Sequence, residues 1–195
     1  ECIEDGGTDL DPILFGSNLA KMHQITGDSF GLDHDNYIGS IEQINTKHTD
    51  WPDFYTSHRL EPLVQKGYDQ GHLNQNELKL FESLYRKLKN VLPQEEPALL
   101  HGDLWQGNLI QDESSNPVLI DPAVYYGHRE MDLSMLELFG TISESSIDSY
   151  QQLFPLEKNW KDRRDIHQLY PLLVHLHLFG KSYLQAIQYT LKKYA

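Results

Sequence analysis

Apolar residues recur at helical spacing over most of this chain, separated by short polar breaks. A proline after Asp11, followed by apolar positions at near-helical spacing, predicts a first helix that Gly27 closes. A second amphipathic helix is predicted from Trp51 to about Lys66, and a third over residues 76–92. The first half of the chain is therefore expected to be mainly helical.

The later part of the chain continues this pattern. Residues 132–139 predict a further helix, and residues 163–193 predict one or two apolar helices interrupted near Gly180. Residues 27–50 show little periodicity and many Gly, Asp, Asn and Thr residues, which is typical of an ordered loop. The apolar anchors expected in this loop are Phe30, Tyr37 and Ile41.

Three short apolar runs predict strands in the middle of the chain. Residues 98–100 lead directly into a polar segment, and residues 109–110 and 118–120 flank a turn-forming stretch, which predicts a small hairpin. The hairpin should bring Asn108 and Asp121 to one mouth. The expected fold class is predominantly helical α+β, with residues 1–195 forming a single domain.

Composition narrows the range of functions. Hydrophobic residues make up 39% of the 195 residues, and no apolar run approaches the roughly 20 residues of a membrane span. The formal net charge of −13 repels a phosphate backbone and argues against nucleic-acid binding. The one cysteine, Cys2, excludes an internal disulfide and fits a reducing compartment such as the cytoplasm. No residue pattern specifies an oligomeric state.

The residues that carry chemistry lie between 101 and 121. The run His-Gly-Asp-Leu-Trp-Gln-Gly-Asn at 101–108, followed by an Asp that ends an apolar strand, has the order and spacing that kinases use for phosphoryl transfer. Asp103 is the candidate to orient the attacking hydroxyl and accept its proton. Asn108 and Asp121 offer hard oxygen ligands for magnesium.

Two further residues are candidates to support this loop. His101 is expected to buttress it from the end of the preceding strand. Asp132 is expected at the start of the next helix, where it could be an N-cap, an anchor for the backbone amides of the catalytic loop, or both.

Aromatic residues and histidines leave alternatives open. Trp105, Tyr125 and Tyr126 flank the motif and could stack on a sugar or shape an acceptor cleft, although aromatics are also ordinary core residues. His175 and His177 do not share a helix face, so they are poor joint metal ligands, and together with His167 they are expected to be structural or surface residues. The Lys and Arg residues of 158–164 are expected to form a solvated face.

The chain resembles the fructosamine kinase family, also called ketosamine 3-kinases. The resemblance rests on residues 101–108 and on Asp-Pro-Ala-Val-Tyr-Tyr-Gly-His-Arg-Glu-Met-Asp-Leu at 121–133. Residues 16–23 and 163–183 also resemble the family, so the likeness covers essentially the whole chain. The tryptophan after His-Gly-Asp-Leu favours this family over its aminoglycoside phosphotransferase and choline kinase relatives.

The resemblance implies the C-terminal lobe of a protein-kinase-like fold and ATP-dependent phosphorylation of a sugar hydroxyl on a glycated amine or a glycated protein lysine. It implies Asp103 as the catalytic base and Asn108 and Asp121 as Mg²⁺ ligands. Glu1 and Ile3 resemble the hinge whose backbone meets adenine, with Ile120 as a floor of the ATP pocket.

The chain departs from the family pattern at its start. Neither a G-x-G-x-x-G loop nor a strand-borne Val-Ala-x-Lys precedes the catalytic motif, and both belong to the small ATP-binding lobe. The expectation is that the small lobe is absent from this chain and that the chain alone has negligible kinase activity.

Three alternatives remain open on the sequence. The acceptor could be an aminoglycoside or choline instead of a ketosamine, which changes the substrate and not the chemistry. The chain could be a non-catalytic binding module that keeps the fold, or a magnesium-dependent hydrolase that uses the same acids. The spacing of the motif fits a kinase better than a hydrolase.

Overall fold

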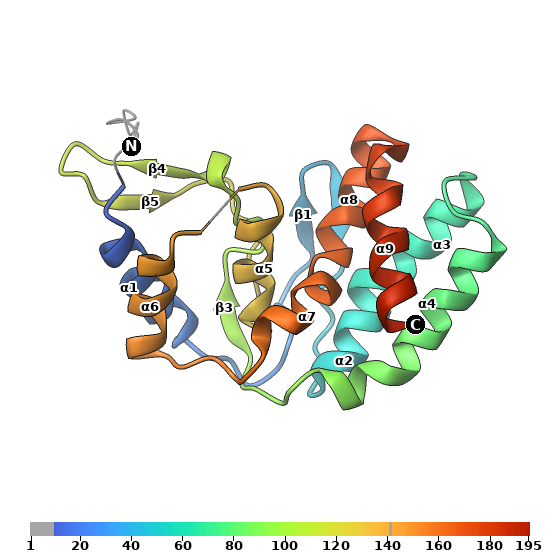
Figure 1. Ribbon diagram of the computed structural model, residues 1–195, viewed down its shortest axis with the longest axis horizontal. Helices are drawn as coiled ribbons and strands as arrows, with labels where there is room; N and C mark the ends of the chain where they lie inside the picture. The colour runs from blue at the N-terminus through green and yellow to red at the C-terminus, as the bar shows by residue number, and fades with distance from the viewer. Residues whose placement is uncertain (1–9, 141) are drawn as a thin grey trace.

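The computed structural model describes residues 10–140 and 142–195 (Figure 1). The α-helices of this part are α1 (Pro12–His23), α2 (Trp51–Phe54), α3 (Glu61–Asp69), α4 (Gln75–Val91), α5 (Glu130–Leu138), α6 (Glu144–Leu153), α7 (Trp160–His167), α8 (Leu169–Phe179) and α9 (Leu184–Tyr194). The strands are β1 (Asn36–Ile38), β2 (Ile41–Gln43), β3 (Ala98–Leu100), β4 (Leu109–Gln111), β5 (Pro117–Leu119) and β6 (Tyr125–Gly127). The expectation of a predominantly helical α+β fold is confirmed.

Helix α1 begins where the sequence predicts. The Asp11 carboxylate accepts hydrogen bonds from the backbone N–H groups of Ile13 at 2.9 Å and Leu14 at 3.2 Å, and proline occupies the first helical position. Helix α1 lies along α6, as Figure 1 shows. A Cβ on Gly16 would collide with the carbonyl of Ser146, so glycine permits this close approach.

The segment predicted as a loop contains a hairpin. Strands β1 and β2 pair antiparallel, with Asn36 opposite Gln43. Phe30 and Ile41 are buried as expected, but Tyr37 is 63% exposed, so its role as an anchor is wrong. Side chains alternate between the two faces of a strand, and here Ile38 takes the buried face.

The second predicted helix is continuous but not uniform. A π-helical segment, η1 (Tyr55–Leu60), separates α2 from α3, which ends at Asp69 instead of Lys66. Pro62, in the first turn of α3, has no N–H to donate to the preceding turn, and the wider helix lies directly before it.

The third helix, α4, is fixed by a capping box. Asn74 accepts a hydrogen bond from the N–H of Asn76 at 2.7 Å, and the Glu77 carboxylate accepts one from the N–H of Asn74 at 2.7 Å. These bonds start the helix one residue before the predicted boundary.

Short strands pair in three two-stranded sheets within the described residues. The predicted hairpin is confirmed, with Leu109 opposite Leu119 in β4 and β5. Strand β6 is not predicted by the sequence pattern; it pairs with β3 and places Leu99 opposite Tyr126. A three-residue strand is too short to show a period, and its partner lies more than twenty residues away.

The C-terminal region holds three α-helices instead of one or two. Helix α7 begins before the predicted Arg163, and Gly180, with φ of 89°, separates α8 from a short 3₁₀ turn and α9. Lys158 and Lys161 are exposed as expected, but Arg163 is only 9% exposed, because its guanidinium pairs with the buried Glu130. The expectation of a solvated face is therefore wrong for Arg163.

Helix α5 also begins earlier than predicted. Its first residue is Glu130, so Asp132 lies inside the first turn and its side chain does not cap the helix. The N-cap interpretation of Asp132 is therefore wrong.

Two clusters of buried hydrophobic residues make up the core. The larger gathers side chains from α2 to α4 and α7 to α9, and the smaller lies between α1, α5 and α6. Helix α5 contributes to both clusters, with Met131 in the larger and Leu136 in the smaller. In the described part of the chain, no helix is long and apolar enough to span a bilayer.

Candidate active site

The catalytic loop, residues 101–108, begins where β3 ends. Gly102 has φ of 82°, and a Cβ there would collide with the carbonyl oxygen of Ala123. The N–H of Ala123 in turn donates to the carbonyl of His101 at 2.9 Å. Both the backbone angle and the close approach therefore require glycine at this position.

His101 links the loop to the end of the hairpin. Its Nε2 lies 2.9 Å from the carbonyl oxygen of Ile120, and its Nδ1 lies 3.3 Å from the backbone N–H of Asp103. A carbonyl only accepts and an amide N–H only donates, so the ring carries its proton on Nε2. The buried imidazole thus holds the loop beside the segment that leads to Asp121.

Asp103 is half-buried at the turn of this loop. Burial raises the pKa of its carboxyl, and the nearby imidazole of His101 and a hydrogen bond from Asn108 oppose this only in part. A carboxylate with a raised pKa accepts a proton more readily than one in water. Asp103 can therefore act as a general base toward a hydroxyl placed beside it.

Asn108 ties the loop together from its far end. Its Nδ2 donates to the main-chain carbonyl of Asp103 at 2.9 Å and to the Asp103 carboxylate at 3.3 Å. The main-chain carbonyl of Asn108 accepts a hydrogen bond from the backbone N–H of Ile120 at 3.0 Å. Ile120 directly precedes Asp121. Asp121 is exposed and has φ of 50°, a left-handed conformation that costs free energy for a residue with a side chain.

These residues fit a magnesium ion by the chemistry of their donors. The Nδ2 group of Asn108 is engaged with Asp103, which leaves its amide oxygen for a ligand. Asp121 adds an exposed carboxylate from the adjoining strand end. Oxygen donors of this kind are those that Mg²⁺ prefers, and it retains several waters in such sites.

Asp132 of α5 holds the start of the catalytic loop through its backbone amides. Its carboxylate accepts hydrogen bonds from the backbone N–H of His101 at 2.7 Å and of Gly102 at 3.0 Å. His23 of α1 lies 3.3 Å from the same carboxylate, and its other ring nitrogen is 2.8 Å from the hydroxyl of Tyr150. We call Asp132, His23, Tyr150 and these two backbone amides the loop network.

Neither His23 nor Tyr150 is predicted as a site residue by the sequence motifs. His23 ends the predicted first helix within the stretch 16–23 that resembles the kinase family, which was the available signal. Tyr150 carries no such signal, because its role depends on α6 packing against α1.

The three candidate substrate aromatics lie in different environments. Tyr125 is fully buried, with its ring 5.9 Å from that of Phe54 and the guanidinium of Arg59 at 4.1 Å from its centroid. It has no exposed face for a substrate, so of the two alternatives for Tyr125 the structure favours the core residue. Trp105 is 39% exposed, and its indole ring covers Gly107 so closely that a Cβ at position 107 would collide with it.

Tyr126 faces away from Tyr125, as alternation along β6 requires. A Cβ on Gly27 would lie 2.9 Å from its ring, and the two residues line a cavity of about 300 Å³. Of the three aromatics, Trp105 alone lies within the catalytic loop itself.

The remaining predicted residues concern ATP. Glu1 and Ile3 lie outside the described residues. Ile120 is half-buried, and its backbone N–H and carbonyl bind Asn108 and His101 as described above.

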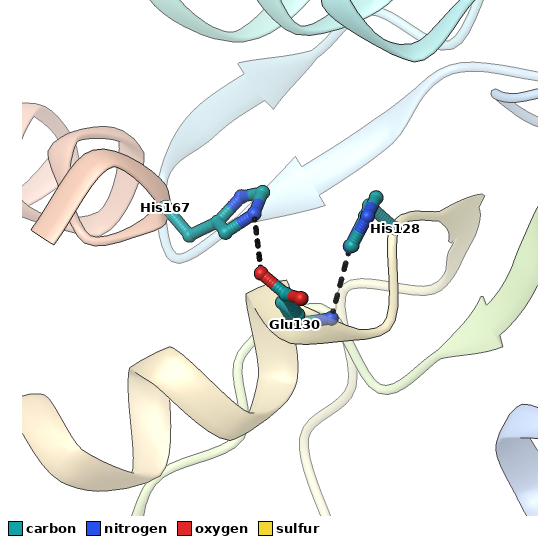
Figure 2. Close-up of side chains that lie close together, drawn as sticks. All are labelled: His128, Glu130 and His167. Carbon is teal, nitrogen blue, oxygen red and sulfur yellow. Dashed lines mark hydrogen bonds and ion pairs between the residues drawn. The ribbon is translucent and has the colours of Figure 1, made fainter. Parts of the chain in front are cut away.

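A second polar cluster lies deeper, between α5 and α7. His128, Glu130 and His167 are all buried, with candidate ligand atoms within 4.8 Å of one another (Figure 2). The histidine rings stack at 5.0 Å, and His167 Nε2 lies 3.4 Å from the Glu130 carboxylate. Together with Arg163 we call these residues the core network.

The bonds within this cluster favour a structural role over metal binding. Both carboxylate oxygens of Glu130 already accept from the guanidinium of Arg163. His128 Nδ1 accepts from the N–H of Glu130 at 3.3 Å, so a neutral ring carries its proton on Nε2. A divalent cation would have to lie beside a guanidinium, which repels it.

Comparison with solved structures defines the class of fold. A choline kinase from Streptococcus pneumoniae aligns over 99% of this chain with a TM-score of 0.57 at 14% identity, which shows a kinase-like fold. A Thermobifida fusca protein described as a candidate fructosamine-3-kinase aligns over 98% of this chain and 67% of its own, with a TM-score of 0.93 and 37% identity.

Sequence comparison gives the family. The fructosamine kinase family model matches residues 6–195. A relative from Enterococcus faecium named "Probable ketoamine kinase" is 42% identical over 100% of this chain and 70% of its own length. A chloroplastic protein-ribulosamine 3-kinase from Arabidopsis thaliana is 39% identical over 94% of this chain and 57% of its own. The chain belongs to the fructosamine kinase family, as its motifs predicted.

Proposed function

We propose that this protein transfers the terminal phosphoryl group of ATP to a sugar hydroxyl of a glycated amine. The observation that carries the proposal is the joining of Asp103 to Asn108 by the Nδ2 hydrogen bonds, with Asp121 held beside them through Ile120. This arrangement offers one base and two oxygen ligands in the order that phosphoryl transfer requires. The names of the relatives support a ketoamine or ribulosamine acceptor.

Asp103 orients the acceptor in the proposed reaction. The hydroxyl oxygen forms a bond to the terminal phosphorus as the bond from that phosphorus to the bridging oxygen of ADP breaks. The hydroxyl proton passes to the carboxylate of Asp103, whose raised pKa favours its acceptance. His101 and Asp132 keep the loop in place during transfer.

Asn108 and Asp121 would hold Mg²⁺ against the terminal phosphates. The ion, when bound, neutralises the charge that these phosphates carry in transfer. The hinge backbone at Glu1 and Ile3, with Ile120, would contact adenine, and Trp105 would face the acceptor. Cys2 as the one cysteine fits a cytoplasmic setting.

We further propose that these 195 residues act as the acceptor- and magnesium-binding lobe. The alignment to 70% and 57% of two relatives' lengths supports this assignment. Loss of one preorganised donor costs roughly 10²- to 10³-fold in rate, so a phosphate-gripping loop and lysine are expected to be needed for full turnover.

The test uses the protein as its gene encodes it, with magnesium-ATP and a panel of fructosyl-lysine, ribosyl-lysine, an aminoglycoside and choline. Phosphorylation of the two sugar-amines, lost when EDTA removes magnesium, is expected. Preference for an aminoglycoside or choline would contradict the acceptor class, and phosphate release from simple esters without ATP would indicate a hydrolase.

A binding experiment on the 195-residue chain separates the lobe from an inert module. Calorimetric titration with ATP should detect magnesium-dependent binding that Asp121→Asn weakens. Absence of binding to the gene's full product as well would favour the non-catalytic alternative. Turnover by the 195 residues alone at roughly 1 to 100 per second would contradict the impaired-lobe proposal.

A further inference from the structure

Four aromatic rings gather where α5 ends and α8 meets the 3₁₀ turn η3 (Lys181–Tyr183). His175 is at their centre, with its ring centroid 4.4 Å from Phe139, 5.0 Å from Tyr183 and 5.2 Å from Phe179. Phe179 is 64% exposed, and the other three rings are half-buried. We call these four residues the aromatic basin.

The basin adjoins the catalytic loop at Gly140, and helix α8, which carries His175, is joined to that loop by hydrogen bonds. A Cβ on Gly140, the residue after Phe139, would lie 3.3 Å from the Oε1 atom of Gln106 in that loop. On α8, the Tyr170 hydroxyl donates to Gln43 at 2.9 Å, and the Gln43 amide donates to the carbonyl of Ala123 at 3.1 Å. Ala123 is the residue packed against Gly102.

The electrostatics of the loop agree with this placement. Burial raises the pKa of the Asp103 carboxyl, and the imidazoles of His101 and His175 act in the opposite direction. Negative charge on Asp103 in turn contributes to the raised pKa of Tyr170 on α8, after burial and the opposing Arg59 charge. Helix α8 therefore lies within electrostatic reach of the proposed base.

The hydrogen bonds of His175 leave one ring nitrogen available. Its Nδ1 lies 2.8 Å from the carbonyl oxygen of Pro171, which can only accept, so Nδ1 carries a proton. The neutral ring therefore has a lone pair on Nε2. Within residues 10–140 and 142–195, no group hydrogen-bonds to this nitrogen.

We propose that the aromatic basin is the subsite for the amine-bearing end of the acceptor, and that His175 Nε2 accepts a hydrogen bond from the acceptor's N–H. Ring faces attract an ammonium group through their negative quadrupole, and they also pack against the apolar face of a sugar. An anionic sugar phosphate would instead need cationic donors at the rings. This inference rests on the proposed sugar-amine kinase function and adds the residues that select the amine.

The test compares an acceptor that carries the amine, fructosyl-lysine, with a sugar that lacks it, free fructose, in the gene's full product. His175→Phe keeps an aromatic ring but removes the acceptor nitrogen. It should raise the KM for fructosyl-lysine about 10-fold, the loss expected for one hydrogen bond, with little change in kcat or in the KM for ATP. The kcat/KM for free fructose should remain within about 2-fold.

Phe179→Ala tests the rings without endangering the fold, because Phe179 is largely exposed. Its matched control is Tyr189→Ala on α9, which is also 64% exposed and lies outside the basin. Phe179→Ala should raise the KM for fructosyl-lysine by several fold, whereas Tyr189→Ala should not. His175→Gln, which retains an acceptor oxygen, should recover part of the loss caused by His175→Phe.

Three results would overturn the inference. The first is an equal loss with both acceptors in His175→Phe, which would indicate a general structural role. The second is an unchanged KM in both His175→Phe and Phe179→Ala. The third is wild-type protein that phosphorylates no sugar-amine, which would refute the proposed function itself and is separated from the first two by the wild-type assay.

Discussion

Helix α5 carries two buried acids two residues apart, Asp132 and Glu130, and they are held in opposite ways. In the loop network, Asp132 accepts hydrogen bonds from two backbone amides of the catalytic loop and lies beside the imidazole of His23. In the core network, Glu130 is held by the guanidinium of Arg163 and by His167. One acid positions a loop, and the other joins two helices.

The difference teaches how one helix serves two purposes. Backbone N–H groups have fixed directions, so a carboxylate bound to them fixes the conformation of the loop that supplies them. A guanidinium on a long side chain fixes helix packing, and its removal leaves a charge buried without a partner. We therefore expect damage to the loop network to lower the rate, and damage to the core network to lower stability.

The largest effect is expected at Asp103, which the loop network supports. Asp103→Asn removes the proposed base without changing the size of the side chain. The kcat of the gene's full product with a sugar-amine should fall by about 10²- to 10⁴-fold. Thermal unfolding should be unchanged within error, and a kcat near the wild-type value would remove Asp103 from the mechanism.

Glu130→Gln should have the largest effect on stability. It leaves Arg163 buried without its anionic partner, which typically costs about 3 to 5 kcal/mol in the free energy of unfolding. Denaturant titration measures this loss. Folded Glu130→Gln protein should retain a kcat close to the wild type, because its contacts do not reach the catalytic loop.

The matched control for this substitution is Glu137→Gln. Glu137 pairs with Arg164, whose side chain is 39% exposed, and such exposed pairs contribute no more than about 1 kcal/mol. Equal destabilisation by Glu130→Gln and Glu137→Gln would show that the core network is not a special feature of the fold.

Asp132→Asn should lower the kcat more than the stability, the opposite of Glu130→Gln. An amide group can accept through only one oxygen, so one of the two backbone N–H groups loses its partner. A hydrogen bond to a charged group contributes about 1.5 to 3 kcal/mol, so a fall in kcat of at least about 10-fold is expected. If Asp132→Asn loses stability but keeps its kcat, then Asp132, like Glu130, has only a structural role.

The free energy of unfolding that the core network contributes should fall as the pH is lowered. Burial, aided by the charge of His167, lowers the pKa of His128 from 6.5 to about 4, so this ring is neutral in the folded protein. An unfolded chain therefore binds a proton at His128 that the folded chain does not. The stability due to His128 is complete above pH 6.5 and is lost as the pH falls toward about 4.

Glu130 adds a second loss at lower pH. Burial alone would raise the pKa of its carboxyl, but hydrogen bonds from His167 and Arg163 lower it from 4.5 to about 2. Its stabilisation is complete above pH 4.5 and is lost as the pH falls toward 2. Between pH 7 and pH 5 only the His128 loss is under way, because the Glu130 loss begins below pH 4.5. The melting temperature should therefore fall from pH 7 to pH 5 in the wild type and fall less in His128→Gln. An equal fall in both proteins would contradict the role of His128 in this loss of stability.

Much of the catalytic loop could be predicted because its parts are close in sequence. The strand before His101, the hairpin after Asn108 and the placement of Asp121 depend on local turn chemistry and short apolar runs, and the structure has these elements. The proposed roles of Asp103, Asn108 and Asp121 remain predictions for the assays above.

The failures share a physical cause, which is packing between distant segments. Tyr125 and Tyr126 are equally aromatic in sequence, but pairing of β6 with β3 buries the first and leaves the second beside a cavity. Arg163 belongs to a basic stretch, yet a buried acid more than thirty residues away takes it into the core. Neither outcome is encoded in the local period of hydrophobic residues.

The sequence by itself determined the helical class of the fold and the order of the catalytic loop, because helix periodicity, capping and turn preference act over a few residues. The tertiary structure alone decided that Glu130 pairs with Arg163 in the core, that His23 and Tyr150 bind to one another beside Asp132, and that His175 lies among three rings. Those choices depend on contacts between residues up to 127 positions apart in the loop network, where shape and hydrogen bonding select the neighbours.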